Sequence, residues 1–322
     1  MAPRILVTAN PLSSLDVMRE LAPAGFDIVV ATAGSPKFHA ALAETEYLVS
    51  LGEASMDRKF YHASPKLRLV QLLSAGYDRV DIEAARQAKV PVCNNGGANS
   101  VAVSEHALLL MLAVCRRLTW LHANVVAGRW RGNDVANVRL YELHGRTLGI
   151  IGLGTIGKKT ARLARAFGMT VQYYDIARLA EDQADALGVR FRLLEELLRT
   201  SDIVSLHVPL TPRSRHMIGA AELKLMQKTA YLINTGRGPV VDEAALIAAL
   251  TDGTIAGAGL DVFDQEPPAA DNHLFRLDNV VLTPHYAGPT WDNQAARFRN
   301  AFDNVQRVAR GEPPLWVIPE LR

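Results

Sequence analysis

The stretch 148–157, LGIIGLGTIG, constrains the fold more than any other part of the chain. Its apolar start is typical of a buried strand, which leads into Gly152, Gly154 and Gly157 in the pattern Gly-x-Gly-x-x-Gly. A strand, a glycine-rich turn and a helix together place free backbone N–H groups and the positive end of the helix dipole where a pyrophosphate can bind. The first glycine permits the tight turn, the second lets a phosphate approach, and the third lets the helix pack closely on the strand.

The residues after this turn indicate a dinucleotide site. A helical pattern at 158–167 is followed by a strand-like run at 169–174, which ends in Asp175, 18 positions after Gly157. The acid that accepts a hydrogen bond from the adenosine ribose is expected at roughly 20 positions. Because a carboxylate there repels a 2′-phosphate, NAD is favoured over NADP, although Arg178 leaves dual use open. The alternative is a purely structural turn.

The composition excludes several classes of protein. With 322 residues, of which 49% are hydrophobic and 21% charged, the chain can form two globular domains. A net charge of +2 gives no indication of a nucleic-acid or membrane partner. Cys93 and Cys115 form no disulfide framework and have no neighbours at metal-ligand spacing, so we expect no metal and a reducing cytoplasm. There is no secretory pattern at the start and no apolar run of ~18 residues.

The first hundred residues predict a sheet domain of their own. Short apolar runs alternate with helix-like stretches, at positions 5–7, 28–30, 47–49, 69–72 and 90–92. Strands at such intervals predict parallel β-α-β units, with helices on both faces of an open sheet. No glycine-rich phosphate turn follows the first strand, so we expect a partner domain rather than a second nucleotide site.

One turn of this domain could bind an anion. The residues 74–77, Ser-Ala-Gly-Tyr, follow a strand-like run, and ligands of α/β sheets bind at the carboxyl ends of strands. The N–H groups of Ala75 and Gly76 could hold a carboxylate there. An ordinary strand-to-loop turn is the alternative.

The middle of the chain contains a very apolar helix. Its residues, 101–118, predict burial on most sides, against another domain or another subunit. Glu105 and His106 resemble a catalytic pair, but we favour structural roles for both. The segment 124–143 has no clear period and predicts a connecting loop. Further strands are expected at 203–207, 230–234, 257–261 and 280–282, a returning helix at 291–310, and an extended tail at 312–319.

Three later turns each carry a polar residue suited to chemistry. Arg237 lies between glycines, where a guanidinium can bind a carboxylate through two parallel hydrogen bonds. Glu266 lies in the run LDVFDQEPP, and His285 lies in LTPHYAG. Each alone could be an ordinary surface or turn residue. Together, on successive strands of one sheet, they supply a substrate anchor, a proton donor and an acid to tune it.

The segments GLGTIG, NTGRGPVVDEAAL, GLDVFDQEPP and TPHYAG, in this order, resemble the NAD-dependent D-isomer-specific 2-hydroxyacid dehydrogenases. The resemblance covers nearly the whole chain and includes SAGYDRVD and the apolar helix. It implies two doubly wound parallel-sheet α/β domains. A Rossmann-type NAD domain, residues 100–285, would be inserted into a flavodoxin-like substrate domain formed by residues 1–99 and 286–322.

The resemblance also implies roles for particular residues. His285 would be the acid/base, Glu266 its carboxylate partner, and Arg237 the residue that binds the substrate carboxylate and polarises the carbonyl. Ala75 and Gly76 would complete the carboxylate site, and Asp261 would hold the nicotinamide carboxamide. The expected cofactor contacts are Gly152, Gly154, Thr155, Ile156, Gly157, Asp175, His207, Val208, Pro209, Thr235, Gly236, Asp261, His285 and Gly288.

The chemistry agrees with these roles. Reduction of a 2-oxo acid places negative charge on the carbonyl oxygen, so a proton must be delivered there. A carboxylate beside a histidine favours the imidazolium that donates it, and a guanidinium stabilises the developing oxyanion. The resemblance therefore implies a reductase of the glyoxylate/hydroxypyruvate type, which acts on a small 2-oxo or 2-hydroxy acid with NAD(H) as cofactor. It also implies a homodimeric assembly, with which the apolar helix at 101–118 agrees.

The substrate and two other functions stay open. Tyr286, beside the histidine, together with Trp291 and Tyr77, could constrict the pocket or stack on a larger substrate. A phosphite- or formate-type dehydrogenase would share the scaffold, although formate enzymes replace the catalytic acid. A non-enzymatic NAD sensor of the corepressor type would retain all three polar residues, so residues alone do not exclude it.

Overall fold

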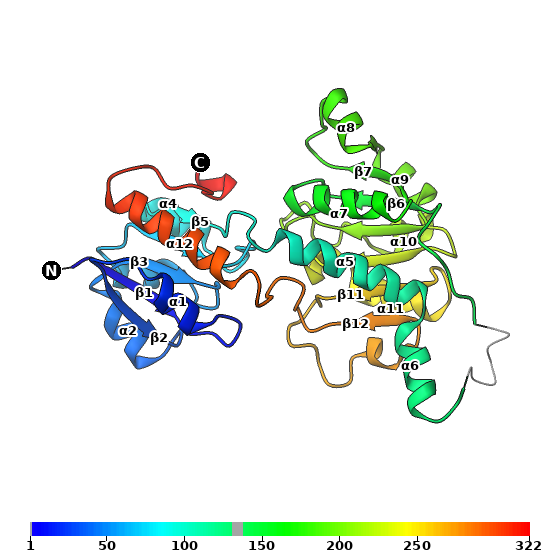
Figure 1. Cartoon of the computed structure of the whole chain (residues 1–322), viewed down its shortest axis with the longest axis horizontal. Coiled ribbons are helices and arrows are strands. Elements are labelled where there is room, and N and C mark those ends of the chain that lie inside the picture. The colour runs from blue at the N-terminus through cyan, green and yellow to red at the C-terminus, as the bar shows by residue number, and fades with distance from the viewer. Residues whose placement is uncertain (1, 131–137) are drawn as a thin grey trace. The chain divides into compact units, whose positions relative to one another are not determined.

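The computed structural model describes residues 2–130 and 138–322, which form two compact units (Figure 1). The first unit contains residues Met1–Asn99 and Gly288–Arg322, and the second contains Ser100–Ala287. Each unit is an α/β structure built on one parallel sheet. The predicted fold class is therefore confirmed, and the second unit is inserted between two segments of the first.

The sheet of the first unit has the order β2-β1-β3-β4-β5. Its strands and helices are β1 (Arg4–Thr8), α1 (Leu15–Leu21), β2 (Asp27–Ala31), α2 (Pro36–Leu42), β3 (Thr45–Ser50), α3 (Arg58–Ala63), β4 (Leu69–Leu72), α4 (Ile82–Ala88), β5 (Val92–Cys93) and α12 (Gln294–Ala309). Two apolar layers, one on each face of the sheet, form its core. Residues of β1, β3 and β4 alternate between these layers because side chains point to opposite faces of a strand in turn.

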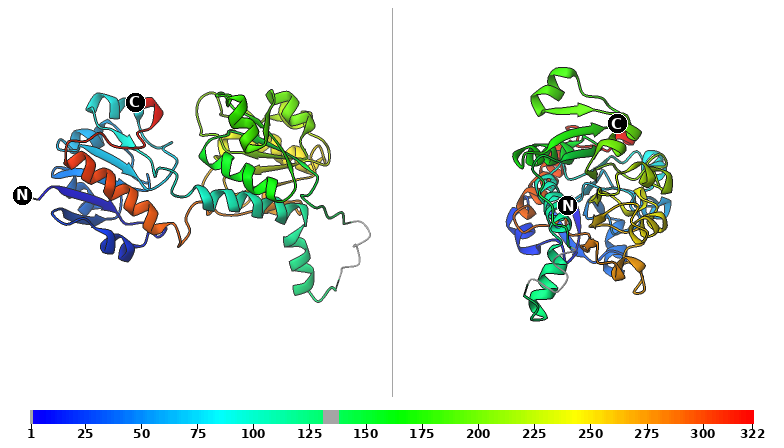
Figure 2. Two further views of the ribbon diagram at one scale, coloured as in Figure 1. Left: turned by 45° about the horizontal axis from the view of Figure 1, so that its top comes forward. Right: turned by 90° about the vertical axis from the view of Figure 1, so that its right-hand side faces the viewer.

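The returning segment completes the first unit. Helix α12 packs against α1 and β4, and its path across the sheet can be followed in two views (Figure 2). Phe298, Phe302 and Val305 are its main buried apolar contacts. After α12, Val317 forms an antiparallel bridge with Cys93, so the predicted extended tail lies at the sheet edge, and the short turn η4 (Pro319–Leu321) follows.

The sheet of the second unit has the order β12-β11-β10-β9-β6-β7-β8. Its strands are β6 (Thr147–Ile151), β7 (Thr170–Tyr174), β8 (Val189–Phe191), β9 (Ile203–Leu206), β10 (Tyr231–Asn234), β11 (Gly257–Leu260) and β12 (Val280–Leu282). The strand order reverses at β6, which has β7 on one side and β9 on the other. This is the topological switch point at which α/β sheets bind ligands.

Helices cover both faces of the second sheet. They are α5 (Ser100–Cys115), α6 (Leu118–Val126), α7 (Thr155–Ala166), α8 (Glu181–Leu187), α9 (Leu194–Thr200), α10 (Ala220–Leu225) and α11 (Glu243–Thr251), with the short turns η2 (Gly238–Val240) and η3 (His273–Arg276). Helix α5 packs against α7 and strands β10 and β11. Among the helices in the described part of the chain, none has the length and apolar content needed to cross a membrane.

Two sequence-based expectations for the second unit were incomplete. The apolar helix ends at Cys115, because Arg117 takes a left-handed conformation with φ of 47°, and a separate helix, α6, extends to Val126. The start of the expected loop 124–143 is therefore helical, and its residues 131–137 lie outside the described part of the chain. Strand β8 was missed because its three residues are too few to show an alternating pattern.

Candidate active site

The glycine-rich turn after β6 has the shape expected of a phosphate cradle. A Cβ atom at Gly157 would lie 2.2 Å from the carbonyl oxygen of Gly152, so only glycine allows α7 to start so close to the strand. A Cβ atom at Gly154 would meet nothing within 4 Å, so the space above the helix N-terminus is open. Thr155 and Ile156 are the first residues of α7, and their N–H groups belong to the unsatisfied first turn of the helix.

Asp175 lies at the end of β7, on the strand next to β6. Its Oδ2 accepts a hydrogen bond from Leu153 N–H at 2.6 Å, and its Oδ1 accepts one from Ala177 N–H at 3.0 Å. The carboxylate is therefore hydrogen-bonded to the glycine-rich turn, and it still has lone pairs that can accept further hydrogen bonds. Arg178 is directed elsewhere, because its guanidinium lies 5.0 Å from the centre of the Phe191 ring.

Two polar atoms at the ends of β9 and β10 have no partner. His207 Nε2 is 3.0 Å from Ser205 Oγ, but Nδ1 is shielded from solvent and has no hydrogen-bond partner within the described residues. Thr235 Oγ1 is likewise shielded from solvent and has no hydrogen-bond partner among the described residues. His207 is partly exposed as a residue, but burial of the ring lowers its pKa to about 4, so the ring is neutral at pH 7. Unpartnered buried polar atoms are rare in native proteins, and here they lie at expected cofactor contacts.

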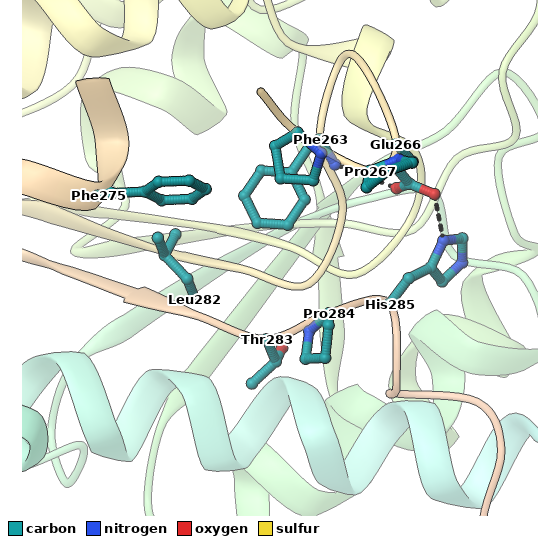
Figure 3. Close-up of a pocket in the computed structure, with 9 residues that line it drawn as sticks. Phe263, Glu266, Pro267, Phe275, Leu282, Thr283, Pro284 and His285 are labelled. Carbon is teal, nitrogen blue, oxygen red and sulfur yellow. Dashed lines mark hydrogen bonds and ion pairs between the residues drawn. The ribbon is translucent and has the colours of Figure 1, made fainter. Parts of the chain in front are cut away.

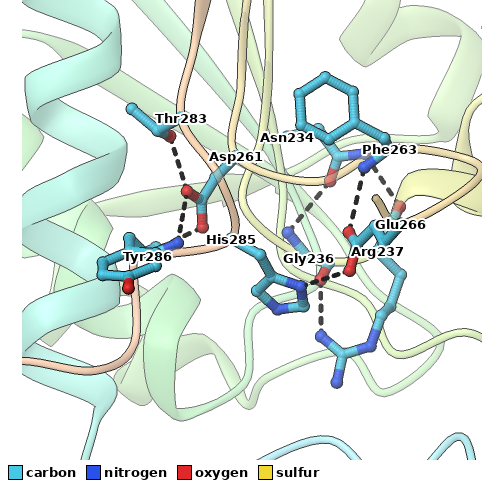
Figure 4. A network of polar contacts seen from close by, with 10 residues as sticks. Asn234, Gly236, Arg237, Asp261, Phe263, Glu266, Thr283, His285 and Tyr286 are labelled. Carbon is cyan, nitrogen blue, oxygen red and sulfur yellow. Dashed lines mark hydrogen bonds and ion pairs between the residues drawn. The ribbon is translucent and has the colours of Figure 1, made fainter. Parts of the chain in front are cut away.

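His285 and Glu266 form a hydrogen-bonded pair in the second unit. His285 Nδ1 lies 2.7 Å from Glu266 Oε2, and the imidazole is directed at the carboxylate (Figure 4). Glu266 Oε1 accepts a second hydrogen bond, from Phe263 N–H at 3.1 Å. The side chain of His285 is 45% exposed and that of Glu266 is 32% exposed. With Nδ1 engaged by Glu266, Nε2 is the nitrogen that can exchange a proton with a bound molecule.

Opposing effects set the pKa of Glu266. Partial burial raises it, but the hydrogen bond and charge of His285, the Phe263 N–H group and the charge of Arg237 together lower the pKa below its ordinary value of 4.5. Glu266 is consequently ionised throughout the neutral range. The ionised carboxylate holds the imidazole in place through Nδ1.

Arg237 is carried by a tight turn after β10. Asn234, which is buried, holds this turn by donating to the carbonyl oxygen of Arg237 at 2.9 Å and accepting from Gly236 N–H at 3.0 Å. The guanidinium Nη1 donates to the Gly236 carbonyl oxygen at 2.7 Å. At Gly238 a Cβ atom would lie 1.8 Å from the Phe263 carbonyl oxygen, so glycine lets the Arg237 turn approach the turn that carries Glu266.

The backbone around His285 is held by Asp261. His285 has a φ of 56°, in the left-handed region that is uncommon for a residue with a side chain. Its N–H group donates to the Asp261 carbonyl oxygen at 2.7 Å. The fully buried Asp261 carboxylate accepts from Tyr286 N–H at 2.9 Å, Ala287 N–H at 2.8 Å and Thr283 Oγ1 at 2.6 Å (Figure 4). This carboxylate thus fixes the residues on both sides of His285.

His106 supports the same network from helix α5. Its Nε2 lies 2.9 Å from Thr283 Oγ1 and 3.5 Å from Asp261 Oδ1. The single hydroxyl hydrogen of Thr283 is donated to Asp261, so the Nε2–H group of His106 must be the donor to Thr283. His106 therefore has the structural role that we expected. The sequence did not indicate Thr283 as part of this network, because a threonine before Pro-His carries no signal of its hydrogen-bond partners.

An apolar pocket of about 430 Å³ lies beside the His285–Glu266 pair (Figure 3). Its walls are Phe263, Glu266, Pro267, Pro268, Phe275, Leu282, Thr283, Pro284 and His285. Figure 3 shows Glu266 between His285 and the rings of Phe263 and Phe275. Apolar walls lower the local dielectric constant, which strengthens the attraction between the carboxylate and an imidazolium.

The remaining expected residues belong to the first unit. Ala75 and Gly76 follow β4, and within residues 2–130 and 138–322 their N–H groups have no hydrogen-bond acceptor. Tyr77 donates its hydroxyl to Glu320 at 3.2 Å; burial, with Glu320, raises the pKa of Tyr77 to about 12. Gly288 begins the returning segment, and its carbonyl oxygen accepts from Asn293.

Most of the expected residues lie at the carboxyl ends of the strands of the second sheet. The turns after β6, β9, β10, β11 and β12 carry Gly152, His207, Arg237, Asp261 and His285, and these strands are neighbours in the sheet. Val208 and Pro209 follow His207, and Thr235 and Gly236 precede Arg237. Because all strands are parallel, their carboxyl ends lie at the same edge.

Comparison with known proteins identifies the family. Residues 108–287 match the model of the D-isomer specific 2-hydroxyacid dehydrogenase NAD binding domain. A glyoxylate reductase of Korarchaeum cryptofilum is 43% identical over 272 residues, which cover 84% of this chain and 82% of that protein. A glyoxylate reductase of Thermococcus gammatolerans is 38% identical and covers the whole chain and 97% of its own length.

Solved structures extend this similarity to the whole fold. The D-lactate dehydrogenase of Aquifex aeolicus, solved with NAD and lactic acid, has a TM-score of 0.85 at 29% identity, with 96% of each chain covered. The turns around Gly154, Arg237, Glu266 and His285 all lie within the segment that the family model matches. The chain therefore belongs to the D-isomer specific 2-hydroxyacid dehydrogenases, and it is an oxidoreductase that uses a nicotinamide cofactor.

Proposed function

We propose that the protein reduces small 2-oxo acids of the glyoxylate and hydroxypyruvate type to D-2-hydroxy acids. The observation that carries this proposal is the His285–Glu266 pair, with 2.7 Å between Nδ1 and Oε2, beside the charge of Arg237. Relatives 43% and 38% identical to this chain are glyoxylate reductases, which supports the choice of small acids.

The nicotinamide group, when bound, supplies the hydride for the carbonyl carbon. His285 delivers a proton from Nε2 to the carbonyl oxygen as negative charge develops there. Glu266, ionised at neutral pH, stabilises the imidazolium before the transfer and orients the ring through Nδ1. Arg237 stabilises the developing oxyanion and binds the substrate carboxylate. For the first unit, we propose that the N–H groups of Ala75 and Gly76 hold a carboxylate.

The residues proposed to hold the cofactor fit a dinucleotide. Gly152, Gly154, Gly157, Thr155 and Ile156 form the pyrophosphate cradle, where an open space lies over the helix N-terminus. The shielded polar atoms of His207 and Thr235 gain partners, and Val208, Pro209, Gly236, Asp261, His285 and Gly288 complete the set. Among the described residues, only Ala287 N–H donates to Asp261 Oδ2, so this oxygen retains one lone pair for the carboxamide.

We propose NAD rather than NADP as the cofactor, because of Asp175. Its carboxylate is held beside the glycine-rich turn by Leu153 and has lone pairs for a ribose 2′-hydroxyl. A 2′-phosphate would meet a negative charge there. Arg178 gives no compensation while it is stacked on Phe191. Both described cysteines are free and buried, which supports a cytoplasmic location for the enzyme.

The reaction is tested by following NADH oxidation across a panel of 2-oxo acids. We expect the highest kcat/KM with glyoxylate or hydroxypyruvate, and about tenfold lower values with pyruvate and phenylpyruvate, because the relatives compared above are glyoxylate reductases. A maximum at phenylpyruvate would instead mean that aromatic side chains such as Tyr286 stack on substrate. No oxidation with any acid would contradict the proposal and favour a non-enzymatic sensor.

Replacement of the acid/base pair should affect turnover more than cofactor binding. His285→Ala should lower kcat by about 1000-fold and leave the Kd for NADH within about threefold, because proton delivery is lost. Glu266→Gln should lower kcat by about tenfold, since the imidazolium loses its charged partner. His62→Ala, at an exposed position of α3, is the control and should keep full activity. Equal losses of kcat and NADH affinity in His285→Ala would argue against the acid/base role.

The effect of Glu266 should depend on pH in a definite direction. Because the folded protein holds the pKa of Glu266 below 4.5, its contribution is complete above that pH and is lost as the pH falls through the lowered pKa. Protonation of Glu266 should therefore not limit the wild-type rate at any pH from 5 upward. A wild-type rate that falls as the pH is lowered from 7 to 5, with no such fall in Glu266→Gln, would mean that Glu266 is protonated in this range.

Asp175→Asn should weaken the preference for NADH. The amide oxygen can still accept the Leu153 hydrogen bond, but the charge that repels a 2′-phosphate is removed. We expect the ratio of kcat/KM for NADH to that for NADPH to fall about tenfold. Arg178→Ala is the matched control and should leave the ratio within twofold. An unchanged ratio in Asp175→Asn would mean that cofactor choice lies elsewhere.

We also propose a homodimer formed through α5, α6 and the described residues that follow as far as Trp130. The exposed apolar side chains Val101, Leu109, Leu118, Val125, Val126 and Trp130 lie on these segments. Val126, at the end of α6, is 72% exposed, and Trp130, four residues later, is 80% exposed. Several large exposed apolar side chains on neighbouring segments are typical of a protein–protein contact. A two-fold contact would remove this surface from water.

Sedimentation at micromolar concentration should give twice the chain mass of 35.1 kDa. Val126→Asp should raise the dissociation constant of the dimer at least about tenfold, because a charge would be buried in an apolar contact. Leu193→Asp, at a 67% exposed apolar position before α9, is the control and should remain dimeric. A monomeric wild-type protein would contradict the proposal.

A further inference from the structure

Arg297 is a buried cation in the first unit. It lies in the first turn of α12, and only 3% of its surface is exposed. Burial lowers the pKa of Arg297 to about 10, which leaves the guanidinium charged at neutral pH. The reaction proposed above gives this charge no role.

The guanidinium binds two backbone carbonyl oxygens. Its Nε donates to Leu73 at 2.9 Å, and its Nη1 donates to Leu12 at 3.3 Å. Leu73 directly follows β4, and Leu12 lies in the segment after β1. In the described ranges 2–130 and 138–322, Arg297 forms no ion pair with a carboxylate. Gln294 also donates to the Leu12 carbonyl oxygen, at 2.9 Å, so this oxygen does not require a charged donor.

This arrangement is unfavourable for stability in three ways. The charge is removed from water, it lacks a carboxylate partner, and it lies at the positive end of a helix dipole. Replacement of a buried charge by an apolar side chain of similar volume is often neutral or stabilising. A charged residue kept at such a place indicates a task other than folding.

The position of Leu73 indicates what that task is. Its carbonyl group shares one peptide plane with Ser74 N–H, and the next two N–H groups, of Ala75 and Gly76, have no acceptor in the described chain. Ser74 Oγ donates to the Gly76 carbonyl oxygen at 2.8 Å, which holds the turn in shape. A guanidinium on the Leu73 oxygen fixes the start of this turn and gives it a positive potential.

We propose that Arg297 is a positioning residue that makes the 74–76 turn selective for carboxylates. It acts through the Leu73 carbonyl group and supplies the charge that backbone N–H groups alone lack. The substrate class that it selects is a 2-oxo acid in its ionised form, in preference to uncharged aldehydes, ketones or esters of the same size. This inference rests on the proposed function, since it assigns the turn to the substrate carboxylate.

The test compares a charged substrate with an uncharged analogue. Kinetic constants are measured with glyoxylate and with its methyl ester for two neutral variants, Arg297→Met and Arg297→Gln, and for Arg297→Lys. Arg299→Met is the matched control, because it removes the same charge from an exposed position two residues further along α12. Thermal unfolding of every variant, with and without NADH and oxamate, gives a readout independent of turnover.

We expect both neutral variants to raise KM for glyoxylate about tenfold with kcat within twofold, and to change KM for the methyl ester less than twofold. Arg297→Lys should restore most of the preference, and Arg299→Met should match the wild type. Oxamate should raise Tm in the wild type, in Arg297→Lys and in Arg299→Met, and much less in the neutral variants. The Tm of the neutral variants without oxamate should be unchanged or higher.

Four results would overturn the inference. Equal losses with glyoxylate and the ester, or a fall in Tm that Arg297→Lys does not rescue, would show that Arg297 only stabilises the fold. Neutral variants with wild-type KM would show that its charge does not reach the substrate. Failure of the proposed function would be seen separately, as a wild-type enzyme that reduces no 2-oxo acid. The oxamate shift would then decide the role of Arg297, and a shift equal in wild type and neutral variants would overturn it.

Discussion

The buried carboxylate of Asp261 is the interaction on which the geometry around His285 depends. The carboxylate accepts hydrogen bonds from two N–H groups and one hydroxyl group of the segment after β12. The main-chain carbonyl oxygen of Asp261 accepts a hydrogen bond from the N–H group of His285. Without the carboxylate, the N–H groups of Tyr286 and Ala287 would lose this acceptor, at a cost of about 1–3 kcal/mol for the buried N–H group of Ala287. The left-handed backbone of His285 is thus maintained by main-chain contacts, so its imidazole is available to Glu266.

His285 in the second unit and Arg297 in the first have different kinds of hydrogen-bond partner. In the second unit, His285 is directly paired with Glu266, whose pKa is lowered although partial burial acts against this. In the first unit, Arg297 is more deeply buried than either of them and has only carbonyl oxygens as partners. A paired charge produces little potential beyond its partner, whereas an unpaired buried charge produces a field that an anion can sense. The pair is suited to proton transfer and the unpaired charge to recognition.

Much of the fold was predictable because its signals are local. The glycine spacing after β6, the apolar runs of the strands and the polar residues that follow them can all be recognised within a few positions. Strand β8 and helix α6 were not predicted. Strand β8 is too short to show an alternating pattern. Helix α6 starts after Arg117, whose left-handed backbone conformation is not indicated by its residue type. Tyr77 was considered as a residue facing substrate, but its hydroxyl group donates to Glu320, which lies 243 positions away.

Residue types and short-range spacing were sufficient to predict the parallel α/β class and the family, and to propose the dinucleotide turn and the reacting residues. Each of these depends on residue type and on spacing over short distances. Only the tertiary structure decided that Glu266 meets His285 at 2.7 Å, that His106 reaches Asp261 through Thr283, and that Arg297 is buried against Leu73. These contacts join residues that lie 19, 177, 22 and 224 positions apart, and their distances follow from strand register and helix packing. No local pattern encodes such quantities, because they result from the packing of elements that meet only when the sheet has formed.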